Sequence, residues 1–312
     1  ALLFYAYREE WSPIRNTLNR LFIFMEVTAL GIYVCFPFYG YDIPTISFLT
    51  AHMLLSYYFV YLVWRRIPDS TIFPDARWVK ASLFFLLLST LGVWFIAPIF
   101  ALELNKTIWY YLAVQFFLHF EINAWFLFVA LALFFIHLRK SGIDCSGPKM
   151  KTAFYLFFIS AALTYALSVA WSRSTWLVST INTAGVVLQA VGAGLLIQYF
   201  WPRRKKIIEV HPALSKSLFL LALSCFVIKI IIQLSLILQV LMEVAYTIRN
   251  FIVGFIHLIL LGIFSAYALS FIRTSGIFRY GRIARAGIVL FIAGFILTEL
   301  IIFTQGGMFW MT

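Results

Sequence analysis

The chain has 312 residues, of which 63% are hydrophobic and 19% aromatic, and its formal net charge is +12. Soluble proteins have an apolar share of about 45–50%, so this composition excludes an ordinary soluble domain. The three cysteines are scattered without any C-x-x-C spacing, which argues against a zinc or iron–sulfur site built on cysteine.

Apolar runs near 20 residues recur along the whole chain, and each is long enough to cross about 30 Å of hydrocarbon. They predict an all-α integral membrane protein with about nine transmembrane helices, in a single domain over residues 1–312. The predicted helices cover residues 20–39, 45–64, 79–102, 108–138, 152–172, 177–200, 214–241, 249–272 and 285–304.

The chain begins with a short apolar stub, Ala1–Ala6, that stops at the polar stretch Tyr7–Glu10. We expect this stub to be the inner end of a preceding helix, with further helices upstream of the sequence given. A secretory signal peptide is a poor alternative, because the charge lies on the wrong side of the apolar segment.

The lysines and arginines gather in alternate loops, which explains the net charge without nucleic acid. Twenty lie in loops of one side, whereas the intervening loops offer only Lys106, Arg173 and Arg249. Positive charge is retained on the cytoplasmic side of membranes. We therefore predict a cytoplasmic amino-terminal stub, an outer carboxyl terminus and the lipid bilayer as the main partner, and we predict no nucleic-acid partner.

Three histidines, His52, His119 and His257, lie inside separate predicted helices. At 1.5 Å per residue they lie about 10, 16 and 12 Å below the predicted outer face. An ionisable side chain in hydrocarbon costs about 2.5 kcal/mol or more, so it usually has a partner or a ligand. We predict one layer of imidazoles facing the bundle interior, suited to metal or heme. For each histidine alone, the alternative is an interhelical hydrogen bond.

Polar side chains at helical spacing accompany His119. Gln115, His119 and Asn123 are spaced i, i+4, i+8 and therefore share one stripe, which should point into the bundle because lipid offers no hydrogen-bonding partner. Glu121 lies about 200° away around the helix and cannot belong to this stripe.

A lysine in the seventh predicted helix is the most costly buried group. Lys229 and Gln233 are four residues apart, so they lie on the same face of their helix. Glu299 in the ninth helix lies at a similar depth in the membrane. A buried lysine without a partner would lose its proton, so we predict that Lys229 is either paired or neutral, with Glu299 as the first-choice partner. The remaining polar residues of the helices and inner loops are interpreted as packing or interfacial residues: His137, Asn182, Gln189 and His211.

The stretch FFLHFEINAWFLFVALALFF resembles a little-characterised bacterial membrane family with an H-F-[QE]-x-N-x-W-F signature. The segments SYYFVYLVW, STLGVWFIAPIF, NTAGVVLQAVGAGLL and RNFIVGFIHLILLG also fit that family, so the resemblance covers most of the chain. More distantly, the chain is similar to the heme–copper oxidase subunit I superfamily, which includes nitric oxide reductases and NnrS-like heme proteins. The resemblance implies a bundle of that type in the bacterial inner (cytoplasmic) membrane.

The resemblance also implies cofactors and roles. His257 would be an axial heme ligand, paired with a histidine of an upstream helix. His119 and His52 would bind a second metal, copper or iron, or line the heme pocket. Supporting or relay roles would fall to Gln115, Asn123, Lys229 and Glu299. The implied function is binding or reduction of a diatomic gas such as nitric oxide, or electron transfer, with respiratory-chain subunits as partners.

The chain departs from that superfamily at several positions. Copper there requires a His-His pair on the next helix, and the predicted helix 152–172 has no histidine. Asn123 stands where oxidases carry tyrosine, and His257 is alone where two histidines are usual. Two alternatives follow: a cofactor-free proton or ion transporter, and a structural subunit of a respiratory membrane complex.

Overall fold

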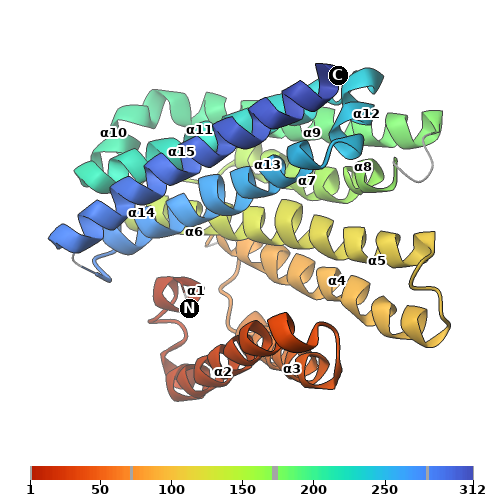
Figure 1. Cartoon of the computed structure of the whole chain (residues 1–312). Helices are drawn as coiled ribbons and strands as arrows, with labels where there is room; N and C mark the ends of the chain where they lie inside the picture. Colours follow the sequence, from red (N-terminus) through yellow and green to blue (C-terminus); the bar gives the residue numbers. More distant parts are fainter. Residues whose placement is uncertain (1, 71–72, 171–174, 279–280, 312) are drawn as a thin grey trace. The chain divides into compact units, whose positions relative to one another are not determined.

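The computed structural model describes residues 2–70, 73–170, 175–278 and 281–311 (Figure 1). These residues contain nine helices long and apolar enough to span a membrane, which confirms the predicted number. The nine spans are Ser12–Tyr39, Ile43–Trp64, Ala76–Ala101, Ile108–Lys140, Pro148–Ala170, Trp176–Glu209, Ala213–Ser235, Arg249–Thr274 and Arg282–Met311. Two loop cations, Arg173 and Arg279, and the predicted helix end at residue 172 lie outside the described residues.

The chain divides into two compact units, residues 1–76 and 77–312. The first unit is built on a pair of long helices that pack side by side (Figure 1). Its helices are α1 (Leu2–Ala6), α2 (Arg15–Tyr39) and α3 (Ile43–Trp64).

The turn between α2 and α3 follows from two residues. Gly40 has φ +56°, a backbone conformation that L side chains rarely adopt. Asp42 then caps α3, because its carboxylate accepts a hydrogen bond from the backbone nitrogen of Ile43 at 2.7 Å. In the same unit the buried hydroxyl of Tyr7 donates to Asp75, which joins its two ends.

The second unit contains the other seven spanning helices. Its elements are α4 (Ala76–Ala101), α5 (Ile108–Leu118), the π-helix η2 (His119–Phe126), α6 (Leu127–Lys140), α7 (Pro148–Leu163), α8 (Tyr165–Ala170), α9 (Trp176–Phe200), α10 (Arg204–Glu209), α11 (Ala213–Ser235), α12 (Gln239–Thr247), α13 (Arg249–His257), the π-helix η4 (Leu258–Ser265), α14 (Ala266–Thr274) and α15 (Arg282–Met311).

The core of this unit surrounds α6, in which nearly every residue from Leu127 to Leu138 is buried. Aromatic rings fill the space beside it: Trp78 stacks on Phe135 with ring centroids 5.0 Å apart, and it meets Phe154 edge-on at 5.2 Å. Such ring pairs add stability beyond the area that they bury. The carboxyl-terminal half of the fourth spanning helix is therefore held in place by close packing.

The exposed face of α15 is largely apolar. Large side chains are exposed at Val289, Leu290, Leu297 and Leu300. Contiguous apolar surface of this extent is unfavourable in water and is typical of a helix that contacts lipid. This fits the lipid bilayer as the surroundings of a multi-pass membrane protein.

The predicted seventh helix, 214–241, runs too far, because α11 ends at Ser235 and a separate helix, α12, follows. Between the two helices the chain forms a turn with backbone hydrogen bonds three residues apart. Leu236 N donates to the Gln233 carbonyl, and Leu238 N donates to the Ser235 carbonyl. Hydropathy missed this end because the turn residues are themselves apolar. The error matters, since α12 borders the candidate site.

Candidate functional site

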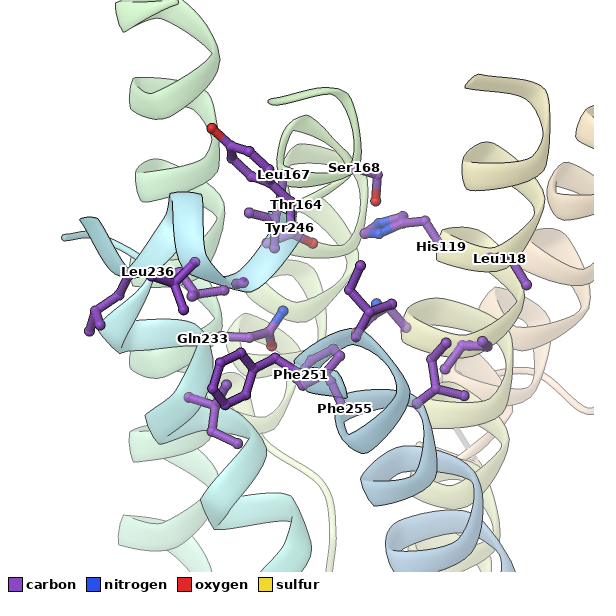
Figure 2. A pocket seen from close by; sticks show the side chains of 18 of the residues that line it. Leu118, His119, Thr164, Leu167, Ser168, Gln233, Leu236, Tyr246, Phe251 and Phe255 are labelled. Carbon is purple, nitrogen blue, oxygen red and sulfur yellow. The ribbon is translucent and has the colours of Figure 1, made fainter. Parts of the chain in front are cut away.

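A cavity of about 640 Å³ lies within the second unit (Figure 2). Pockets for small molecules measure about 300–1,000 Å³, so the size fits a small organic ligand. Side chains of α5, η2, α8, α11, α12, α13 and α15 form its walls. The aromatic part of the lining consists of Tyr111, Tyr246, Phe251, Phe255, Phe303 and Trp310.

The polar stripe predicted from the sequence lines this cavity. Gln115, His119 and Asn123 all contribute to its wall, which confirms that the stripe faces into the bundle. The Oδ1 atom of Asn123 is buried and has no hydrogen-bond partner among the described residues. Glu121 faces elsewhere, as predicted, and accepts a hydrogen bond from the Ser89 hydroxyl at 2.7 Å.

His119 is held in one tautomer by the neighbouring helix. Its Nε2 lies 2.9 Å from the carbonyl oxygen of Ala161, in the last turn of α7, where helical carbonyls lack an N–H of their own helix. A carbonyl only accepts, so Nε2 of the neutral ring carries the hydrogen and Nδ1 keeps its lone pair. The ring also meets Tyr165 edge-on, with centroids 5.6 Å apart. The lone pair on Nδ1 of His119 can therefore accept a hydrogen bond or bind a metal ion.

Two π-helical segments of this unit begin at histidines. His119 is the first residue of η2, and His257 directly precedes η4. The segments contact each other, and the rings of Phe126 and Phe264 lie 4.8 Å apart. Short π-helical insertions are rare and frequently mark functional sites, because the widened turn changes the direction of the side chains.

The partner predicted for Lys229 is wrong. Its Nζ donates to Gln189 Oε1 at 2.6 Å and to Gln233 Oε1, and Lys229 is 0% exposed. Depth counting placed Glu299 at a similar level but could not show which helices are neighbours. The two glutamines, on α9 and on α11 one turn away, satisfy the lysine, and Gln189 is therefore more than a packing residue.

Glu299 instead lies beside His257. The Oε1 atom of Glu299 is 3.5 Å from His257 Nδ1, and the side chain of His257 is 35% exposed. His257 is not part of the cavity wall, although its neighbours Phe255 and Ile256 are. Its side chain thus faces α15 and the cavity wall is formed by the other side of α13.

His52 belongs to the first unit. Its Nδ1 lies 2.9 Å from the Thr28 hydroxyl, which is the interhelical hydrogen bond expected of a lone histidine in a membrane helix. The predicted layer of three histidines joins both units, and it stays a prediction.

A metal centre is not assembled by the described part of the chain. No group of three His, Cys, Asp or Glu side chains there is close enough to hold a metal ion. His119 directs one ring nitrogen to α7, and His257 directs one to α15. Heme, copper and iron stay predictions that require ligands from outside the described residues.

The two remaining histidines meet at the predicted inner end. The rings of His137 and His211 lie 4.9 Å apart, and His211 stacks on Phe219 at 4.4 Å. Nδ1 of His211 donates to the Ile207 carbonyl at 2.9 Å. These contacts agree with the structural role predicted for His211, and the interfacial position predicted for His137 stays a prediction.

The burial of His211 predicts that the stability of the protein depends on pH. Burial lowers the pKa of His211, and its hydrogen bond to Ile207 opposes this only in part. The unfolded chain then binds the proton more tightly, so stability is full above about pH 6.5 and falls as the pH is lowered towards the folded-state pKa. As the pH is lowered, the midpoint temperature of unfolding in detergent should fall less steeply in His211→Gln than in the wild type. Equal slopes would contradict this assignment.

Sequence reasoning missed several residues of the cavity: Tyr111, Thr164, Ser168 and the α12 residues Leu241, Val244, Ala245 and Tyr246. The break between α7 and α8 at Thr164 carries no proline or glycine, so no local signal marks it. The polar residues Gln239 and Glu243, one turn apart, were the available sign that α12 is a separate helix.

Comparison of the chain with protein-family models, with curated proteins and with solved structures finds no match.

Proposed function

We propose that this multi-pass membrane protein binds a small amphipathic molecule in the cavity of the second unit, as a membrane transporter or receptor does. The observation that carries the proposal is the polar stripe of Gln115, His119 and Asn123. It lies in the middle of a spanning helix and lines a largely apolar cavity. Ligand sites combine apolar walls with a few placed polar groups. The bacterial cytoplasmic membrane is the predicted location.

The cavity lies towards one end of the bundle. Its wall includes α12, which connects two spanning helices, as well as Tyr111 and Trp310, near the ends of theirs. From the start of α5, His119 is about 16 Å deep at 1.5 Å per residue. The distribution of lysine and arginine predicts this end to be the outer one, so the ligand enters from outside and meets Asn123, one turn deeper than His119, at the inner end of the polar stripe.

Native mass spectrometry of the protein released from its own membrane tests this function. The wild type should retain a small molecule, which organic extraction then identifies. The cavity-filling variant Ser168→Phe should have only its own mass. A wild type with no retained molecule, and no added molecule that binds, would overturn the proposal.

A heme protein of the oxidase-like type, active in electron transfer or with nitric oxide, is the second candidate. One observation favours it: Glu299 lies next to Nδ1 of His257, and histidines that bind metal usually give that second nitrogen to a carboxylate or a carbonyl. The other axial ligand would come from outside the described residues. A Soret absorption band that disappears in His257→Ala would support this candidate, and protein from heme-replete cells without such a band would exclude it.

A further inference from the structure

Lys229 lies directly behind the cavity wall, where an anion in the cavity would stabilise its ammonium form. We infer, on the basis of the proposed function, that the ligand is a small organic acid whose carboxylate docks at Gln233 under the influence of Lys229. Gln233 and Phe255, which both contact Lys229, are part of the cavity lining. The inference thus assigns a chemical class to a ligand that the cavity alone leaves open.

The contacts of Lys229 are all ones that an ammonium group can make. Two of its hydrogens go to the amide oxygens of Gln189, at 2.6 Å, and of Gln233. Its Nζ also lies over the Phe255 ring, 5.9 Å from the centroid, which is a cation–π distance.

The residues that the structure describes do not supply the matching negative charge. In the described ranges Lys229 forms no ion pair, since Glu121 is bonded to Ser89 and Glu299 lies beside His257. A charge buried in a medium of low dielectric constant acts over a longer distance than in water. An anion in the cavity would therefore gain energy that a neutral molecule of the same shape would not.

The side-chain amide of Gln233 lies between Lys229 and the cavity. Its Oε1 is fixed on Lys229, so its NH₂ group must point away from the lysine, and Figure 2 shows its nitrogen directed into the cavity. The other glutamine is arranged differently, because its Nε2 donates at 3.2 Å to the buried Ser160 hydroxyl. Gln233 therefore offers hydrogen-bond donors to a carboxylate, with a cation behind them.

The opposite wall of the cavity offers hydrogen-bond acceptors instead of donors. Nδ1 of His119 and the unpaired Oδ1 of Asn123 are acceptors. The rings of Phe251 and Phe255 lie on the side between the two walls (Figure 2). This pattern fits an acid with an apolar or aromatic body and a hydrogen-bond donor at its far end.

Three probes of matched size separate charge from shape: benzoate, benzyl alcohol and benzylamine. Their affinities are measured by saturation-transfer NMR on the protein in lipid nanodiscs. The wild type should bind benzoate at least about tenfold more tightly than either of the others. Equal affinities, or a preference for benzylamine, would overturn the inference but leave the proposed function standing. If the wild type binds none of the three, the inference fails, and the proposed function fails with it when the wild type also retains no molecule of its own.

Two variants test the source of the charge. Lys229→Met removes the ammonium, and Gln189→Glu places a carboxylate next to it from the side away from the cavity. In both, benzoate affinity should fall about tenfold, with a much smaller change for benzyl alcohol. Lys216→Met, which removes an exposed lysine from the same helix, is the control and should leave benzoate affinity unchanged. Unaltered benzoate affinity in a folded Gln189→Glu protein would exclude Lys229 as the source.

Discussion

Replacing Gly92 with valine is expected to destabilise the protein by about 1–3 kcal/mol, which is the usual effect of overpacking. A Cβ atom at Gly92 would lie 2.5 Å from the Ala113 carbonyl oxygen and 2.8 Å from the Phe117 backbone nitrogen. Both are backbone atoms of α5 and cannot rotate away. The helix that carries Gln115 and leads into η2 would have to move away from α4.

Thermal unfolding in detergent measures this effect. Gly194→Val is the matched control, because Gly194 also lies within a spanning helix and a Cβ there would meet nothing within 4 Å. The control should unfold at nearly the wild-type temperature. If both variants unfold at the same temperature, the close approach of α4 and α5 is not what Gly92 provides.

Filling the cavity is expected to have the largest effect on binding. Ser168 lies on the cavity wall, as Figure 2 shows, and phenylalanine in its place would occupy the volume that a ligand needs. In Ser168→Phe the affinity for benzyl alcohol should fall about tenfold or more. The measurement is the NMR titration described for the three probes.

Thr180→Phe provides the control for this substitution. Thr180 is exposed on α9 and is not part of the cavity wall, so the same added ring should leave the affinity unchanged. Similar losses in the two variants would show that the probe binds at the protein–lipid boundary instead of in the cavity.

The spanning helices could be predicted because the bilayer imposes their length and apolarity, two properties that a sequence states directly. The stripe of Gln115, His119 and Asn123 could be predicted for a similar reason, since spacing along one helix fixes which side chains share a face. Their position on the cavity wall agrees with this, even though η2 is a π-helix.

The contacts between helices could not be predicted in the same way. Depth along the membrane normal gave Glu299 as the partner of Lys229, but the contacts depend on which helices are adjacent, and α9 and α11 supply Gln189 and Gln233 instead. The end of α11 was missed because Leu236 continues the apolar pattern through the turn. Packing between helices, not hydropathy, determines both features.

Protection of a cysteine placed in the cavity is the most direct test of ligand binding there. The variant Ser168→Cys is made with Cys35→Ser, because Cys35 is half-buried whereas Cys145 and Cys225 are buried. A small thiol reagent should label the cysteine at 168, and saturating benzyl alcohol should slow the labelling about tenfold. Thr180→Cys, outside the cavity, should be labelled at the same rate with or without the probe. A labelling rate at 168 that saturating probe leaves unchanged would contradict the assignment of this cavity as a binding site.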